Sequence, residues 1–132
     1  MRTVLFVLLL LAPLPSLALD PCYPDITGHW RGPVRNEGDI QTLDTDFALD
    51  AAGLPEGTYH VMADEAFEGT LTEFHETGPC EGDFTWTDRY GSGIVHIVFM
   101  PARGRFFGNW GLDRPEPGNI FNGFRRRVPP LS

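Results

Sequence analysis

Short apolar runs separated by turn residues occupy the chain from residue 26 onward. Within these runs, apolar and polar side chains tend to alternate with a period of two, which is the period of a β-strand. No stretch beyond residue 18 repeats apolar residues at helical spacing over three turns, and the 15 Gly and 12 Pro residues disfavour long helices. We therefore predict an all-β domain. Its strands cover residues 26–34, 43–49, 57–62, 67–74, 81–87, 93–100, 105–112 and 120–126.

The connections between these strands are short and rich in turn residues. Residues 50–53, 77–79, 88–91 and 101–104 each combine Gly with Asp, Thr, Pro or Arg, as tight turns do. Short connections favour antiparallel pairing of strands in sequence order. The predicted architecture is an eight-stranded antiparallel up-and-down barrel, and a β-sandwich is the alternative.

A glycine pattern recurs in six of the strands. Each copy, here called the Gly frame, has an apolar residue or proline at its first position, Gly at its third and a large residue at its fifth. The six copies start at Ile26, Pro55, Phe67, Cys80, Phe106 and Phe121. All three marked positions lie on one face of a strand, and Gly inside a strand permits a bend or a close approach. The pattern favours a tightly coiled barrel in which large side chains fill the space above each Gly.

The first 18 residues have the features of a signal peptide. Arg2 provides a positive start, residues 4–14 are almost entirely apolar, and Ser16 and Ala18 suit a signal-peptidase site. The apolar run is shorter than the roughly 20 residues that span a bilayer. We expect residues 1–18 to be removed, which leaves residues 19–132 as a single periplasmic or secreted domain with no membrane association.

Cysteine and charge composition restrict the chemistry further. Cys22 and Cys80 are the two cysteines, and an even count in an exported chain predicts a disulfide. The net charge of −8 disfavours nucleic acid as a partner. The chain contains no lysine, which excludes Schiff-base and Ser–Lys mechanisms.

Motifs for catalysis or metal binding are lacking. His29, His60, His75 and His96 do not occur at metal-ligand spacing, and three of them (all except His75) alternate with the Gly frame and are predicted to face outward. Ser92 lies between two glycines but lacks the pattern of a nucleophile elbow. We therefore predict no catalytic residue, no metal and no cofactor.

Large aromatic side chains are the best candidates for a binding role. Six of them share the predicted inward face: Trp30, Tyr59, Phe84, Trp86, Phe106 and Trp110. Small closed barrels bind ligands at their mouths, in apolar pockets with a few polar groups. The alternative is that these side chains simply fill the core.

Two strand openings resemble those of known barrels. Residues 26–30, Ile-Thr-Gly-His-Trp, and residues 57–59, Gly-Thr-Tyr, are similar to the first two strands of avidins. Gly28-x-Trp30 also resembles the Gly-x-Trp start of lipocalins, and residues 91–125 are similar to small exported bacterial barrel proteins. The chain thus resembles the calycin-type barrels. In lipocalins this Trp stacks under an Arg from the last strand, which implies that Arg125 lies against Trp30.

These observations lead to one expected function and two alternatives. We expect a non-enzymatic exported protein that binds a small, largely apolar ligand. The first alternative is an inhibitor or adaptor that acts through its outer surface on another exported protein, and the second is a barrel enzyme of the isomerase or cyclase kind. Ile94, Val98 and Met100 are predicted to face outward together, which favours a homo-oligomer contact.

Overall fold

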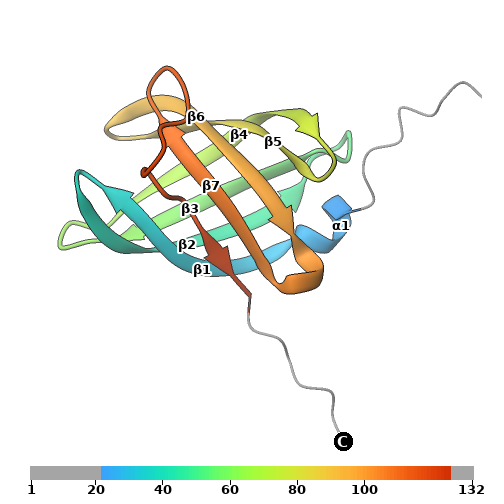
Figure 1. Cartoon of the computed structure of the whole chain (residues 1–132), viewed down its shortest axis with the longest axis horizontal. Coiled ribbons are helices and arrows are strands. Elements are labelled where there is room, and N and C mark those ends of the chain that lie inside the picture. The colour runs from blue at the N-terminus through green and yellow to red at the C-terminus, as the bar shows by residue number, and fades with distance from the viewer. Residues whose placement is uncertain (1–21, 126–132) are drawn as a thin grey trace, which may run out of the picture.

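The computed structural model describes residues 22–125, which form a closed barrel (Figure 1). The elements are α1 (Cys22–Ile26), β1 (Gly28–Asn36), β2 (Asp39–Leu49), β3 (Pro55–Met62), β4 (Phe67–Gly78), β5 (Glu81–Asp88), β6 (Gly91–Met100), the 3₁₀ helix η1 (Pro101–Arg103), β7 (Arg105–Gly111) and β8 (Gly123–Phe124). Each strand pairs antiparallel with the next, and β8 pairs with β1 to close the sheet. The up-and-down barrel is confirmed, and the sandwich is excluded. The predicted signal peptide and residues 126–132 lie outside the described residues.

The predicted strand boundaries need correction at several points. Strand β2 begins at Asp39, four residues earlier than predicted, because β1 and β2 form a tight hairpin around Glu37 and Gly38. The predicted last strand over residues 120–126 is reduced to β8 with isolated bridges at Ile120 and Phe121. The five-residue helix α1 was not predicted, because it is too short to show a helical period.

Several glycines of the Gly frame are explained by aromatic rings that cross from the neighbouring strand. A Cβ atom at Gly69 would collide with the ring of Tyr59, which extends from β3 over β4. The ring of Phe106 crosses Gly123 in the same way, and Phe74 crosses Gly82. A residue without a side chain is needed at such points of close approach. Gly28 differs, since it has a φ of 112° and open space around it.

One end of the barrel is closed by α1, which lies at the right of Figure 1. Tyr23 and Ile26 of this helix are fully buried, and the Trp30 indole N–H donates a hydrogen bond to the Ile26 carbonyl at 2.8 Å. The predicted disulfide between Cys22 and Cys80 is present and joins the helix to the turn that precedes β5. The closed end is therefore held by a covalent bond, apolar burial and hydrogen bonding.

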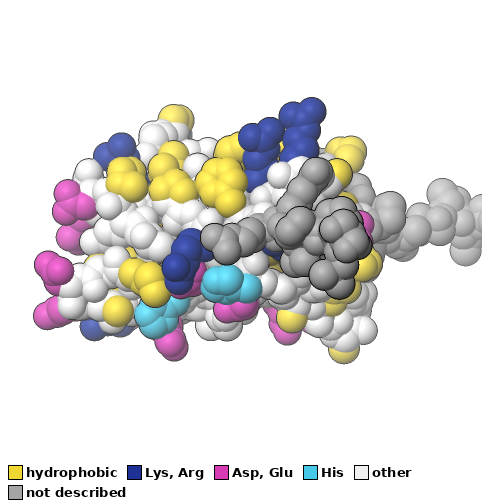
Figure 2. Space-filling view, turned by 90° about the horizontal axis from the view of Figure 1, so that it is seen from below, with side chains coloured by type: hydrophobic (Ala, Val, Ile, Leu, Met, Phe, Trp, Pro, Cys, Tyr) yellow, Lys and Arg dark blue, Asp and Glu magenta, His cyan; other side chains and the backbone are white. Residues whose placement is uncertain are grey.

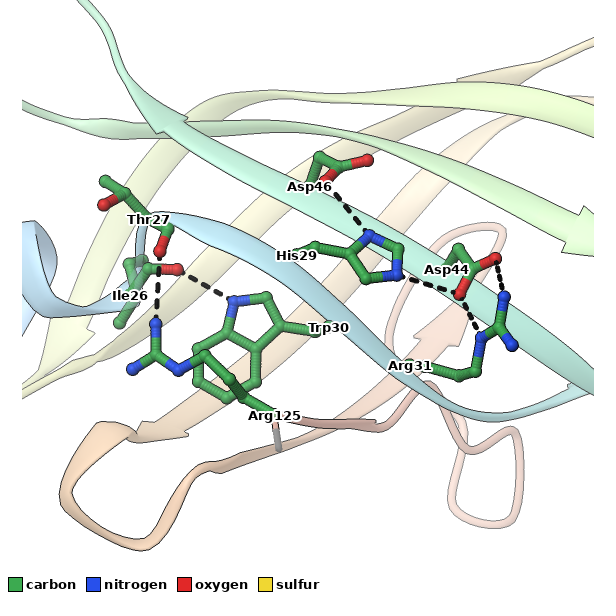
Figure 3. A network of polar contacts seen from close by, with 8 residues as sticks. All are labelled: Ile26, Thr27, His29, Trp30, Arg31, Asp44, Asp46 and Arg125. Atoms are coloured by element: carbon green, nitrogen blue, oxygen red, sulfur yellow. Dashed lines mark hydrogen bonds and ion pairs between the residues drawn. The ribbon is translucent and has the colours of Figure 1, made fainter. Parts of the chain in front are cut away.

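Arg125 completes this end, as predicted. Its guanidinium carbon lies 4.2 Å from the centroid of the Trp30 ring. One terminal nitrogen donates a hydrogen bond to the carbonyl oxygen of Thr27 at 3.1 Å (Figure 3), and the other donates to the carbonyl oxygen of Asp25 at 2.7 Å. Arg125 lies just beyond β8 and remains partly exposed, so its charge is not fully desolvated. The contact links the last strand to the helix that precedes the first.

The half of the barrel next to α1 is filled by aromatic side chains. Phe106 contacts Trp30, with ring centroids 5.6 Å apart, and also Phe47, at 5.5 Å. Phe84 packs against Phe47 and Phe74 at 5.9 and 4.8 Å. The two contacts of Phe106 are edge to face and the two of Phe84 are tilted, and such ring pairs add to the stabilisation by apolar burial. This half therefore forms a solid core.

The outer face carries cross-strand ion pairs. Arg31, Asp44, His60 and Glu68 lie side by side on β1 to β4, with alternating sign when His60 is protonated. The Arg31 guanidinium donates two hydrogen bonds to Asp44, at 2.6 and 2.9 Å, and holds the pKa of that carboxyl below its usual range. His29 contacts Asp44 from the same strand as Arg31 (Figure 3). The histidines predicted to face outward do so, and they pair with carboxylates.

Within residues 22–125, no helix has the length and apolar character needed to cross a membrane.

Candidate functional site

A cavity of about 240 Å³ opens at the end of the barrel opposite α1. It lies where β1, β3, β5 and β7 end and β4 begins. Its lining is Val34, Arg35, Asn36, Glu37, Tyr59, Val61, Phe67, Trp86, Asp88, Tyr90, Trp110, Leu112 and Phe121. Most of these side chains are apolar, as is typical of small-molecule sites, although the volume lies below the common range of about 300–1,000 Å³. The barrel is thus solid at one end and hollow at the other.

Two tryptophans form adjoining walls of the cavity. The rings of Trp86 on β5 and Trp110 on β7 meet edge to face, with centroids 5.6 Å apart. The Trp86 indole N–H donates to the Gly111 carbonyl at 3.0 Å, and the Trp110 indole N–H donates to the Arg35 carbonyl at 2.8 Å. Because each ring is held by a backbone acceptor, both walls are fixed in position before any ligand enters.

A tyrosine–aspartate pair is the main polar feature of the cavity. The Tyr59 hydroxyl donates to the Asp88 carboxylate at 2.6 Å. Burial raises the pKa of Tyr59 far above its usual value, and the hydrogen bond to Asp88 raises it further. Tyr59 therefore keeps its proton at physiological pH. The second oxygen of Asp88 accepts a hydrogen bond from the backbone N–H of Tyr90 at 2.8 Å.

Aromatic residues also surround the mouth. Phe67 and Tyr90 pack edge to face at 4.9 Å. The Arg89 guanidinium stacks on both rings, at 5.6 Å from Phe67 and 4.9 Å from Tyr90, and pairs with Glu65 at 3.4 Å. Leu112, which follows β7 and also lines the cavity, is 67 % exposed. The mouth is therefore bordered by apolar side chains together with charged residues.

The six aromatic candidates divide into two groups. Tyr59, Trp86 and Trp110 line the cavity. The other three, Trp30, Phe84 and Phe106, lie in the filled half next to α1 and are almost completely buried. The sequence placed all six on the inward face, but it did not show which half of the barrel was hollow.

Several lining residues were missed. Val61, Phe67 and Phe121 are buried on the inward face, and the alternation of their strands could have identified them. Asp88 was interpreted as a turn residue only. It follows Trp86 by two positions, and this spacing places both on the same face of β5. An acidic residue at an inward-facing position near the end of a strand could therefore have indicated the polar group of the cavity.

Among residues 22–125, no group of three or more His, Cys, Asp or Glu side chains is arranged to hold a metal ion. Comparison of the chain with protein-family models, with curated proteins and with solved structures finds no match. The class of the protein is therefore defined by its own architecture, an eight-stranded antiparallel barrel with one closed end and one open, aromatic-lined end.

Proposed function

We propose that this chain is an exported, non-enzymatic binding protein that holds a small, largely apolar ligand in the cavity at the open end of a calycin-like barrel. The observation that carries this proposal is the cavity itself, which is lined by Trp86, Trp110 and Tyr59 at one end of an otherwise filled barrel. The disulfide supports an oxidising destination. The arrangement of Trp30 and Arg125 supports the calycin-like assignment.

Pre-formed walls support a binding role more than a packing role. A core residue gains most from complete contact with its neighbours, and a cavity forfeits such contacts. Here, Trp86 and Trp110 are each tied to a backbone carbonyl in an orientation that leaves space beside them. An apolar ligand that enters this space would recover the contacts and remove apolar surface from water.

A cavity-filling substitution tests the proposal. Val61→Phe adds volume to the wall, whereas Val98→Phe adds the same volume to the outward face of β6. In titrations with small apolar compounds followed by tryptophan fluorescence, we expect Val61→Phe to lose the saturable response and Val98→Phe to keep it. Native mass spectrometry of protein isolated from its host should show a bound small molecule. A ligand-free mass, together with no saturable response from the unmodified protein, would overturn the proposal.

The outer surface provides a specific observation for the second candidate, an inhibitor or adaptor. Phe107 on β7 and Phe124 on β8 are 39 % and 46 % exposed, and their ring centroids are 6.5 Å apart. Figure 2 shows a row of apolar side chains on one outer face, beside a group of Arg, His and acidic side chains. If the protein acts through this face, Phe107→Ser should abolish capture of a protein partner and Val61→Phe should leave it unchanged.

A further inference from the structure

The hydrogen-bond donors of three side chains in the cavity walls, Trp86, Trp110 and Tyr59, are already used within the protein. The indole N–H groups of Trp86 and Trp110 donate to backbone carbonyls, and the hydroxyl proton of Tyr59 goes to Asp88. Each of these groups has only one proton to donate. A ligand that lies between these walls therefore meets no free donor from any of the three side chains.

Acceptors remain available at the same place. An ionised carboxylate has about four lone-pair positions, and the described contacts of Asp88 use one on each oxygen. The oxygen of Tyr59 also keeps its lone pairs when it donates its proton. Asp88 and the Tyr59 oxygen therefore form an acceptor surface with negative charge in the cavity wall.

The positive groups near the cavity are turned to other partners. Arg35 donates through two of its nitrogens to the carbonyls of Gly118 and Gly38, both at 2.9 Å, which directs its guanidinium to those loops. Arg89 is paired with Glu65 outside the mouth. The side-chain amide of Asn36 donates to Gln41. Asp88 consequently lacks a cationic partner among the described residues.

The aromatic walls suit a cation as well. The faces of Trp, Tyr and Phe rings attract ammonium and guanidinium groups, and Trp does so most strongly. The Arg89 guanidinium already lies over the rings of Phe67 and Tyr90. Trp86 and Trp110 provide two further rings within reach of the same space as Asp88.

We propose that the cavity selects a small organic ammonium compound, whose apolar body lies against Trp86 and Trp110 and whose protonated amine donates hydrogen bonds to Asp88. This inference rests on the proposed binding function and names its ligand class. A buried ammonium group needs a paired acceptor, which Asp88 supplies. A carboxylic acid of the same shape would meet Asp88 as a like charge and would find no free donor on Trp86, Trp110 or Tyr59.

Three compounds of matched shape test the proposal: phenethylamine, propylbenzene and 3-phenylpropanoate. In calorimetric titrations, we expect phenethylamine to bind and 3-phenylpropanoate to give no measurable binding. Asp88→Asn should weaken phenethylamine about tenfold and leave propylbenzene within about twofold. Asp64→Asn removes an acid from the exposed β3–β4 turn at the same end of the barrel and should change neither affinity.

A comparison of ligands in the unmodified protein keeps the test valid if Asp88→Asn does not fold. Phenethylamine and 3-phenylpropanoate differ mainly in the charge of their terminal group, so the unmodified protein should bind the amine and reject the acid. The ammonium proposal is overturned if 3-phenylpropanoate binds as tightly as phenethylamine, or if Asp88→Asn weakens propylbenzene as much as the amine. If none of the three compounds binds, the binding function itself fails.

Discussion

Gly69 is needed for the hydrogen bond between Tyr59 and Asp88, because the Tyr59 ring lies directly over this glycine. A methyl group at position 69 would overlap this ring, so Gly69→Ala should push Tyr59 aside and break its hydrogen bond. Overpacking of this kind costs about 1–3 kcal/mol of unfolding free energy. Thr70→Ala, on the opposite and exposed face of β4, should cost much less. Urea unfolding measures both, and equal losses would contradict the crossing-ring explanation.

Thr45 is a buried residue with an unsatisfied hydroxyl. It has no exposed surface, and its oxygen has no hydrogen-bond partner in the described part of the chain. An unpaired buried polar group is unfavourable, whereas valine has nearly the same shape and no polar atom. Thr45→Val should therefore raise the unfolding free energy by about 1 kcal/mol. Thr42→Val on the exposed face of β2 is the control and should have little effect on stability. A loss of stability in Thr45→Val would show that the Thr45 hydroxyl has a hydrogen-bond partner.

At the scale of elements, the pairing of β1 with β8 depends on few residues. Strand β8 has only two residues, so Arg125 carries much of the connection to α1 through Trp30 and two carbonyl groups. Arg125→Ala should lower the unfolding free energy by about 1–2 kcal/mol, and Arg125→Lys should recover only part of it, because lysine lacks the planar fork. The exposed Arg103 of η1 provides the control, Arg103→Ala. If both alanine variants unfold at the same urea concentration, the contacts of Arg125 with Trp30 and α1 do not stabilise the fold.

The disulfide is a second connection between α1 and the barrel, in addition to Arg125. Cys22 and Cys80 are separated by 58 positions, and closing a loop of this length stabilises the fold by about 4 kcal/mol on the chain-entropy model. Replacing both cysteines by alanine should therefore lower the urea concentration at the unfolding midpoint substantially. The wild-type protein should show a similar decrease when its disulfide is reduced. An unchanged midpoint would show that the bond contributes nothing to stability.

The elements differ in how well the sequence predicted them. Strands with clear alternation, such as β6 with Val95, Ile97 and Phe99 inward, were predicted within two residues. The last strand was predicted too long, because residues 120–126 have strand composition whereas the described residues 120–125 pair with β1 and β7 at only a few positions. Composition alone does not reveal how many hydrogen bonds a terminal segment forms.

At the scale of the whole molecule, barrel closure followed from the number of strands and their short connections, whereas the location of the cavity did not. Which half of a barrel is filled depends on how rings from several strands meet, as Phe47, Phe84 and Phe106 do near α1. Such contacts join residues far apart in the sequence. The acceptor role of Asp88 likewise depends on Tyr59, which lies on another strand.

The three tryptophans provide the most direct test of the binding cavity. Trp86 and Trp110 line the cavity, and Trp30 lies in the closed half beside α1. In ¹⁵N–¹H spectra recorded during titration with phenethylamine or propylbenzene, we predict saturable shifts of the Trp86 and Trp110 indole signals and an unchanged Trp30 signal. Equal shifts of all three signals, or shifts confined to the outward residues of β7 and β8, would contradict a binding site at the open end of the barrel.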